Sequence, residues 1–298
     1  MKHGLAITAL GILAFILVFS GSERVRAETF EPQPCTYELK QDGSAEQAIV
    51  PRLLIACLDA AAPELRDGFA FTEFAVALRT GDVPDNELQN LKSILLSMLA
   101  AADEDENGFR GPFAVLALSE IARTDRISPW MSEEERLELA TAGADYLETL
   151  SDYRGFIEGE GWRHGVAHTA DLFMQLALSD RVSQAEADIV LSAISAKVAP
   201  ANAPAYTFGE PERLARPVIF LARAGLLDDE KAADFFQSLW PDEADTRWQA
   251  PYASEAGLVA LHNTKAFANA IHLSAALSPS AEDDLLMAHA VELMAQLP

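Results

Sequence analysis

Basic residues are scarce in this sequence. Only 22 lysines and arginines stand against 46 aspartates and glutamates, which gives the 298-residue chain a formal net charge of -24. Such a chain repels phosphate groups, so the charge excludes nucleic-acid binding through the phosphate backbone and docking on anionic lipid through a basic patch. The chain has enough apolar residues to form a hydrophobic core, because 50% of the residues are hydrophobic and 8% are aromatic. This composition excludes disorder as the main state.

Several enzyme signatures are also missing. The chain has no phosphate-binding glycine loop, no dinucleotide fingerprint and no Ser-His-Asp order of a serine hydrolase. The sequence therefore gives no direct indication of a common nucleotide-dependent or acyl-transfer activity.

The first part of the chain predicts an export signal. A short basic start is followed by an uncharged run from Gly4 to Gly21, and Val25-Arg26-Ala27 then offers small residues where a signal peptidase cleaves. We expect residues 1–27 to be a signal peptide removed after Ala27, so that the protein is periplasmic or extracellular. The alternative is an uncleaved N-terminal anchor, because this run is just long enough to span a bilayer.

Cysteine is nearly absent, since Cys35 and Cys57 are the only two. Neither belongs to a C-x-x-C redox or metal motif. In an oxidising compartment an even number of cysteines favours pairing, so we expect a Cys35–Cys57 disulfide. Such a bond ties the N-terminal arm, residues 28–45, to the first helix and contributes about 3 kcal/mol in the chain-entropy model. In the alternative, Cys57 is a small buried hydrophobic residue and Cys35 is a free thiol.

Beyond residue 45 the hydrophobic pattern predicts helices almost without interruption. Apolar residues recur at spacings of three and four, and no stretch alternates long enough to predict a strand. Ser132 and Ser183 each precede a glutamate by three residues, which is typical of a capping box, and Ser280 shows a weaker form of this pattern. The predicted helices cover residues 46–61, 64–80, 85–102, 111–124, 133–150, 163–179, 184–198, 210–225, 229–239, 254–276 and 281–296. The fold class is therefore expected to be all-α.

The similar helix lengths and short connections predict antiparallel helix hairpins. We expect these hairpins to form a HEAT-like α-solenoid or an α/α toroid-like array over residues 46–298 as a single domain. No residue pattern recurs at the hairpin spacing, so the expected repeat is structural only. A compact irregular bundle is the alternative.

One segment carries a candidate site. Glycines cluster before Trp162 and predict a turn, and a helix is predicted from about Trp162 onward. On that helix His164, His168 and Asp171 share one face, because they are spaced i, i+4 and i+7. We expect these three side chains to face a common cavity. The complete candidate binding cluster is Glu158, Trp162, His164, His168, Asp171 and Arg213.

The chemistry of this cluster leaves two interpretations open. Nitrogen and carboxylate donors on one face suit a divalent metal or an acid–base pair. If a metal binds, its ligands are His164, His168 and Asp171, with Glu158 or Glu160 as a further oxygen donor. The structural alternative is that a histidine binds a helix-end carbonyl and Asp171 orients a turn. The spacing H-x-x-x-H also lacks the glutamate of the zinc-protease motif.

Three motifs resemble a known family. They are Arg154-Gly155-Phe156-Ile157-Glu158, then Gly161-Trp162-x-His164-x-x-Ala167-His168-x-Ala170-Asp171, and finally Gly209-Glu210-x-Glu212-Arg213-Leu214-Ala215. On these residues, the stretch from roughly Leu65 to Ala270 resembles the bacterial family called domain of unknown function 2785. The resemblance implies a helical-repeat architecture. It implies no activity and no catalytic residues, because the family is uncharacterised.

The sequence supports competing functional hypotheses. The favoured one is an exported helical scaffold whose concave face binds a protein, a peptide or a glycan, with no nucleic-acid partner and no stable membrane association after signal cleavage. The alternative is a metal-assisted hydrolase or lyase that uses the Glu158, His164, His168 and Asp171 cluster, with a divalent metal as its cofactor. A third interpretation makes the segment around Trp162 a folding determinant.

Overall fold

The computed structural model describes residues 33–239, 246–278 and 280–298. The predicted signal peptide, residues 1–27, lies outside the described residues, as does the beginning of the N-terminal arm. Packed pairs of helices make up nearly all of the described chain, so the predicted all-α class is confirmed. Among the described residues, no helix is both long enough and apolar enough to cross a membrane.

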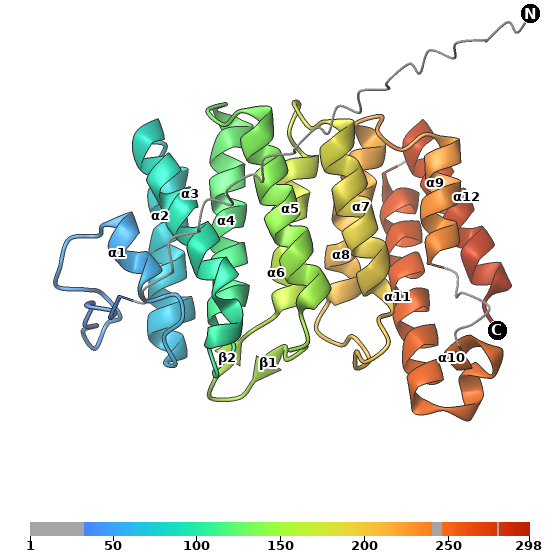
Figure 1. Ribbon diagram of the computed structural model, residues 1–298, viewed down its shortest axis with the longest axis horizontal. Coiled ribbons are helices and arrows are strands. Elements are labelled where there is room, and N and C mark those ends of the chain that lie inside the picture. The colour runs from blue at the N-terminus through green and yellow to red at the C-terminus, as the bar shows by residue number, and fades with distance from the viewer. Residues whose placement is uncertain (1–32, 240–245, 279) are drawn as a thin grey trace, which may run out of the picture.

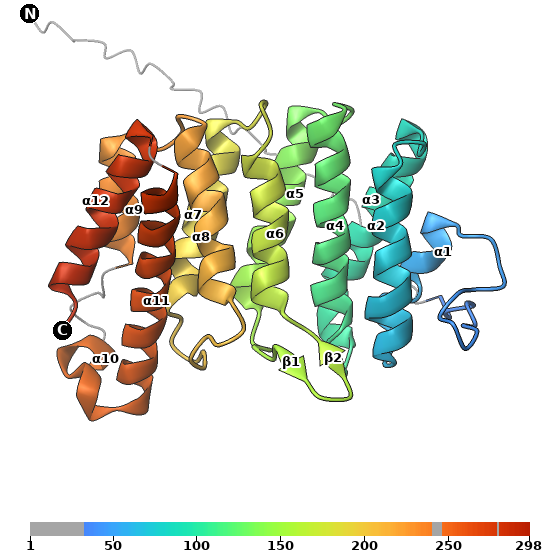
Figure 2. The ribbon, with the colours of Figure 1, turned by 180° about the vertical axis from the view of Figure 1, so that it is seen from behind.

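The helices form two layers that lie face to face, as the opposite views in Figures 1 and 2 show. Successive helices along the chain alternate between the layers, and each layer also has its own neighbour contacts. One layer contains α3 (Asp85–Ala100), α5 (Glu133–Thr149), α7 (Gln184–Val198) and α9 (Asp229–Ser238). The other contains α2 (Thr72–Arg79), α4 (Arg110–Ile127), α6 (Gly165–Ala177), α8 (Glu210–Arg223) and α11 (Glu255–Leu277). At the C-terminal end α12 (Ala281–Gln296) packs on α8, α9 and α11.

Helix starts follow the capping pattern of the sequence. Ser132 accepts a hydrogen bond from the Glu135 amide, and the Glu135 carboxylate accepts one from the Ser132 amide. Ser183 and Glu186 repeat this reciprocal arrangement at the start of α7. These bonds satisfy amide groups that have no partner inside the helix. The capping boxes are therefore confirmed, and α7 and α12 have the predicted bounds.

The prediction of the first helix is mostly wrong. Instead of covering residues 46–61, it is limited to α1 (Pro51–Ile55), and Cys57 lies in the turns that follow. Its start is set by Pro51, because the residue before a proline is disfavoured in a helix, and Val50 is accordingly extended with φ -127° and ψ 113°. Beyond the end of α1, Arg66 donates hydrogen bonds to the carbonyls of Ala60 and Ala61 at 2.8 and 3.2 Å. Arg66 itself belongs to η1, a π-helix over Glu64–Phe71 that continues into α2.

A short hairpin was also missed. Strand β1 (Phe156–Ile157) pairs antiparallel with β2 (Gly161–Trp162) between α5 and α6. Gly159 and Gly161 adopt φ values of 81° and 82°, a region that costs a side-chain-bearing residue strain. Two-residue strands are too short to produce a visible alternation of apolar and polar residues. Three shorter pieces complete the described chain: η2 (Ala102–Glu104), α10 (Thr246–Gln249) and η3 (Pro251–Ala253).

The two cysteines lie at disulfide distance. Their Cα atoms are 4.7 Å apart, within the range that a disulfide requires, and no free cysteine remains. The structure therefore places the predicted pair at disulfide distance. This contact lies beside α1, where Cys57 is completely buried.

Candidate functional site

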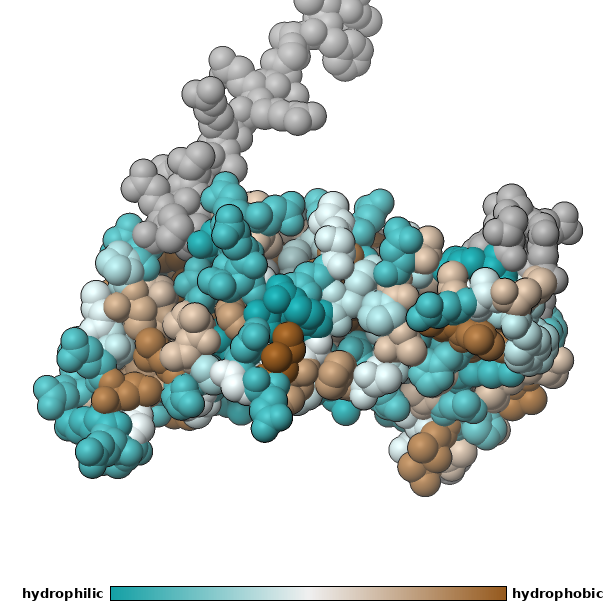
Figure 3. Space-filling model, turned by 90° about the horizontal axis from the view of Figure 1, so that it is seen from below, coloured by the Kyte–Doolittle hydropathy of each residue, from teal (hydrophilic) through white to brown (hydrophobic). Residues whose placement is uncertain are grey.

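Three helices begin at the same end of the molecule, where the β1–β2 hairpin lies (Figures 1 and 2). Pro112 lies in the first turn of α4, His164 directly precedes α6, and Glu210 is the first residue of α8. The candidate residues are therefore assembled from three neighbouring helices of one layer. Seen from this end, the surface is mainly hydrophilic and is interrupted by separate hydrophobic patches (Figure 3).

The hairpin holds His164 in an unusual backbone conformation. The His164 amide donates to the Arg154 carbonyl, and the Arg163 amide donates to the Gly155 carbonyl. His164 has φ 58° and ψ 36°, which makes it the one non-glycine residue with a left-handed backbone in the described part of the chain. Helix α6 consequently begins at Gly165. The sequence had predicted an earlier start, near Trp162. Strain of this kind persists only where the surrounding structure enforces it, and it concentrates at functional sites.

Buried arginines attach the hairpin to the core. Arg66 donates to the Glu160 carbonyl at 2.6 Å, and Arg163 pairs with the Glu160 carboxylate at 2.8 Å. The guanidinium carbons of Arg66 and Arg163 lie 3.6 and 4.2 Å from the centre of the Phe109 ring. Cation–π contacts between desolvated groups are stronger than exposed ones. The hairpin is therefore a fixed part of the fold.

Three exposed aromatic side chains gather around the hairpin. We call Phe156, Trp162 and Phe208 the aromatic cluster; their exposed fractions are 46%, 37% and 41%. The Trp162 ring centre lies 5.2 Å from that of Phe156 and 6.0 Å from that of Phe208. Phe208 also covers the backbone of Gly155, where a Cβ atom would come within 2.1 Å of the phenyl ring. The cluster thus joins the hairpin to the loop before α8.

Beneath this cluster lies a buried histidine with an unpaired nitrogen. His164 stacks on Trp162 with ring centres 4.8 Å apart, and its Nε2 atom is buried without a hydrogen-bond partner. The nearest carboxylate oxygen, Oε1 of Glu210, is 3.9 Å away, which is too far for a hydrogen bond. Burial, together with the positive charge of Arg213, lowers the pKa of His164 to about 4. His164 is therefore neutral at neutral pH.

Glu210 takes part in the turn before α8. Its Oε2 atom accepts a hydrogen bond from the Phe208 amide at 2.8 Å, and its side chain is almost completely buried. Burial raises the pKa of Glu210, while the backbone hydrogen bonds oppose this rise. Glu210 was not predicted as a site residue, although it belongs to the motif that begins Gly209-Glu210.

His168 and Asp171 connect α6 to the two neighbouring helices. Nδ1 of His168 lies 3.1 Å from the Pro112 carbonyl oxygen; because a carbonyl only accepts, the proton must be on Nδ1. Burial lowers the pKa of His168 to about 3. On the other side Asp171 forms an ion pair with Arg213 of α8. Burial raises the pKa of Asp171, and the charge of Arg213 opposes this rise.

The structure brings together part of the predicted cluster. The ring centres of His164 and His168 are 5.5 Å apart, and Arg213 contacts Asp171. Glu158 lies exposed in the turn of the hairpin. Among the described residues, no group of three or more histidines, cysteines, aspartates or glutamates is arranged so that it could hold a metal ion. The geometry instead offers a neutral buried histidine behind exposed aromatic rings.

Comparison with known proteins identifies a family and nothing more specific. The family model described as "Protein of unknown function (DUF2785)" matches residues 95–273, which is more than half of the chain. No curated protein and no solved structure matches the chain. The matched region contains both the hairpin and helices α4, α6 and α8. The resemblance found in the motifs is thus confirmed, and the chain belongs to the DUF2785 family.

Proposed function

We propose that this protein is an exported helical module that binds a peptide segment of a partner protein at the hairpin end. The aromatic cluster is the observation that carries the proposal. Exposed apolar groups that gather on an otherwise polar surface mark interaction sites, and aromatic residues are enriched at protein interfaces. The cluster stands on a rigid base, because the hairpin beneath it is attached through Arg66 and Arg163.

Charge indicates the chemistry of the partner. Glu158 is exposed in the turn beside the aromatic cluster, whereas Glu160 is paired with Arg163, and the chain as a whole carries a net charge of -24. A negative field attracts positively charged ligands and accelerates their association. The bound peptide is therefore expected to combine basic side chains with apolar or aromatic ones. Arginine is the best basic residue for this purpose, because its guanidinium stacks on aromatic rings.

A displayed random-peptide library tests this function. The library is selected on purified protein, and the enriched peptides are then measured on the Trp162→Ala variant. The expected result is a set of peptides enriched in Arg or Lys next to an apolar residue, whose affinity falls at least tenfold on Trp162→Ala and Phe156→Ala. The matched control is Tyr252→Ala, which removes an aromatic ring exposed to 66% outside the cluster and should leave binding unchanged. Circular dichroism verifies that each variant is folded.

Two results would contradict the peptide proposal. One is the enrichment of sequences that bind the Trp162→Ala variant as well as the unmodified protein. The other is Trp162-dependent binding on a glycan array without any peptide binding, which would make the partner a carbohydrate. For the metal-assisted hydrolase or lyase we find no supporting observation, since the described residues contain no group suited to hold the metal.

Export is part of the same proposal. It is supported by the uncharged run Gly4 to Gly21, the small residues before Ala27 and the paired cysteines. N-terminal sequencing of protein from an osmotic-shock fraction should find Glu28 as the first residue. Protein with an intact N-terminus in the membrane pellet would contradict the proposed cleavage.

We also propose that the helix pairs form a HEAT-like solenoid. The support is the regular alternation of helices between two layers and the neighbour contacts of α4 with α6 and of α6 with α8. In a solenoid, each unit contacts only its neighbours. A crystal structure in which the pairs α3–α4, α5–α6 and α7–α8 are related by one common rotation and translation would support it. Unrelated transformations between successive pairs would indicate an irregular bundle.

A further inference from the structure

A short turn connects the cysteine pair to the start of α4. Cys35 and Cys57 are at disulfide distance, with Cα atoms 4.7 Å apart. We call residues 57–61 the cysteine turn; in it the Cys57 carbonyl accepts a hydrogen bond from the Ala60 amide at 3.2 Å. Asp59 of the same turn forms an ion pair with Arg110, the first residue of α4, at 3.0 Å. The cysteine turn is therefore held by the cysteine pair and by α4.

Arg66 links the cysteine turn to the hairpin. Its Nη1 atom donates hydrogen bonds to the carbonyls of Ala60 and Ala61, and its Nη2 atom donates to the Glu160 carbonyl at 2.6 Å. The Arg66 side chain is completely buried, so these bonds replace the water contacts that the guanidinium has lost. A shift of the cysteine turn would leave part of this buried charge without partners. The position of the hairpin therefore depends on the position of the turn.

Strand β2 lies directly against the segment that contains Arg66. A Cβ atom at Gly161 would come within 2.5 Å of Asp67 Oδ2, 2.7 Å of Arg66 Nη2 and 3.0 Å of Pro63 Cβ. No side chain fits between β2 and this segment. The next residue of β2 is Trp162, which belongs to the aromatic cluster. A displacement of the segment must therefore move the strand that carries Trp162.

This segment is the π-helix η1, which contains Arg66 and Asp67 within its eight residues. Helices of this type are rare and occur frequently at functional sites. A π-helix forms hydrogen bonds between residues i and i+5, whereas an α-helix forms them between i and i+4. Conversion of η1 to an α-helix would change the directions in which the Arg66 and Asp67 side chains point. Of the two hydrogen-bond patterns open to this segment, the observed one supports the hairpin.

We propose that the Cys35–Cys57 pair is a redox switch of the peptide-binding site at the aromatic cluster. The oxidised pair holds the cysteine turn and, through Arg66, keeps the hairpin in its binding position. The inference rests on the proposed function, because peptide binding is the property that the switch controls.

A dithiol reductant opens the switch. Its thiolate attacks the sulfur of Cys35, which is half-buried, whereas Cys57 is completely buried and is the leaving group. The second thiol of the reductant then closes the reductant into a cyclic disulfide. Two protons and two electrons pass from the dithiol to the protein, which retains two thiols. The released turn no longer fixes Arg66, and η1 converts to an α-helix.

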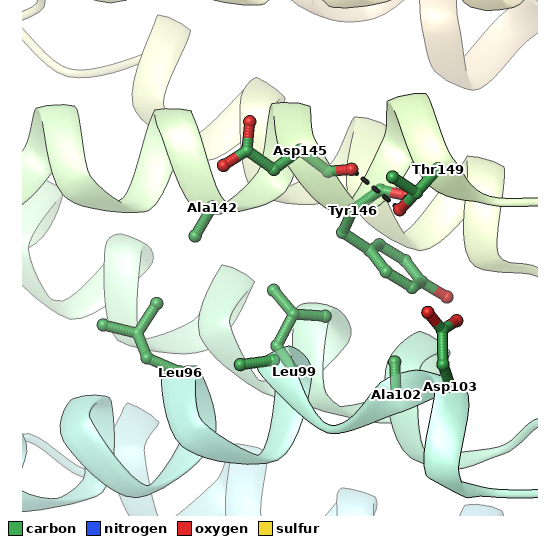
Figure 4. A pocket seen from close by; sticks show the side chains of 9 residues that line it. Leu96, Leu99, Ala102, Asp103, Ala142, Asp145, Tyr146 and Thr149 are labelled. Carbon is green, nitrogen blue, oxygen red and sulfur yellow. Dashed lines mark hydrogen bonds between the residues drawn. The ribbon is translucent and has the colours of Figure 1, made fainter. Parts of the chain in front are cut away.

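Hydrogen exchange of the full-length mature protein, measured by mass spectrometry with and without the dithiol, tests the switch. The hairpin amides of Glu160, Arg163 and His164 have backbone partners and should exchange at least tenfold faster after reduction. The reference is α5, which packs on α3, α4, α6 and α7 and lines a cleft of about 280 Å³ with Ala142 and Tyr146 (Figure 4). Its exchange should stay within twofold.

A matched pair of glycine variants tests the path through η1. Gly161 and Gly159 have φ values of 82° and 81°, so alanine costs similar backbone strain at both positions. Only Gly161→Ala places a Cβ atom against η1; at Gly159 nothing lies within 4 Å. We expect fast hairpin exchange in Gly161→Ala without reductant, whereas Gly159→Ala should keep the redox response. Equal behaviour of the two variants would overturn the proposed path.

Two further results would overturn the switch. One is unchanged hairpin exchange after alkylation of the quenched sample has shown that both thiols are free. The other is an equal acceleration in α5, since reduction would then loosen the whole protein. The Cys35→Ser/Cys57→Ser variant should exchange fast in the hairpin with and without the dithiol. These measurements need no peptide, so they stand apart from the proposed function.

Peptide affinity completes the test. A peptide selected from the displayed library should bind the reduced protein at least tenfold more weakly than the oxidised protein. Equal affinity for both forms would overturn control of the site by the cysteine pair. Absence of peptide binding to either form, together with redox-dependent exchange of the hairpin, would contradict the proposed function and leave the conformational switch in place.

Discussion

The Nδ1 atom of His168, in the first turn of α6, lies 3.1 Å from the carbonyl oxygen of Pro112, in the first turn of α4. This hydrogen bond links two neighbouring helices of one layer inside a buried environment. His168 also contacts the Phe113 ring edge to face, with ring centres 5.7 Å apart. The histidine is therefore both a donor to a carbonyl and a packed ring. The neutral imidazole of His168 can make both contacts, because its Nδ1 carries the proton that the carbonyl accepts.

Protonation of this pair of histidines should reduce stability. The pKa values of His164 and His168 fall to about 4 and about 3, whereas an unfolded histidine titrates near 6.5. Between these values the unfolded state binds more protons, so the free energy of unfolding decreases as the pH falls below about 6.5. The slope is up to about 1.4 kcal/mol per pH unit for each histidine. Urea unfolding at pH 7, 6 and 5 measures it.

A matched pair of variants assigns that slope. His168→Asn keeps a donor near the Nδ1 position but does not titrate, so the slope between pH 6.5 and 5 should fall by about half. Asp171 and Glu210 contribute in the opposite direction at lower pH, because burial raises their pKa values. His262→Asn changes an exposed histidine and should leave the slope unaltered. An unchanged slope in His168→Asn would show that His168 is not the titrating group.

The close approach of α5 to α6 depends on a glycine. A Cβ atom at Gly143 would lie 2.9 Å from Cε1 of Phe173 and 3.1 Å from Cδ2 of Leu172, and both side chains are completely buried. Gly143→Ala should therefore lower the free energy of unfolding by about 1–3 kcal/mol through overpacking. Gly68→Ala is the control: its nearest neighbour would be 3.9 Å away, and it should stabilise by about 0.5–1 kcal/mol. Equal effects of the two substitutions in urea unfolding would contradict the packing.

The predictable part of the fold was the part determined locally. The capping boxes at Ser132 and Ser183 lie within a few residues of the helices that they start, so the sequence pattern revealed them. The helix expected over residues 46–61 failed at its start because Val50 is extended before Pro51, which begins the short α1. Apolar periodicity alone does not register such a proline boundary.

The candidate site was predictable to a similar extent. The spacing predicted one helix face for His168 and Asp171, but His168 bonds to Pro112 of α4 and Asp171 pairs with Arg213 of α8. Three features that define the surroundings of the two histidines could be seen only in the tertiary structure. The Pro112 carbonyl and the Glu210 carboxylate come from other helices, and the left-handed backbone of His164 is rare for a residue other than glycine. Residue spacing therefore located the segment but not the environment of its side chains.

The ion pair between Asp171 and Arg213 should contribute measurable stability. Asp171 is mostly buried, with 14% of its side chain exposed, so solvent screens it only in part. Asp171→Asn should cost about 1–2 kcal/mol, because Arg213 then loses its charged partner. Glu138→Gln removes a partner of Lys92 whose side chain is 55% exposed, and it should cost less than about 1 kcal/mol. Chemical unfolding in low and high salt compares them; a smaller loss for Asp171→Asn than for Glu138→Gln would contradict this ranking.

Reduction should destabilise the N-terminal arm and, through it, the first helices. Cys35 and Cys57 close a loop with a sequence separation of 22, for which the chain-entropy model gives about 3 kcal/mol. Protein purified without reductant should contain no thiol that can be alkylated, and reductant should lower its unfolding temperature. The Cys35→Ala/Cys57→Ala variant is the matched control: it should unfold at a reduced temperature that reductant does not change further. Two alkylated cysteines in unreduced protein would show that the bond does not form, and an unfolding temperature insensitive to reductant would show that the arm does not stabilise the helices behind it.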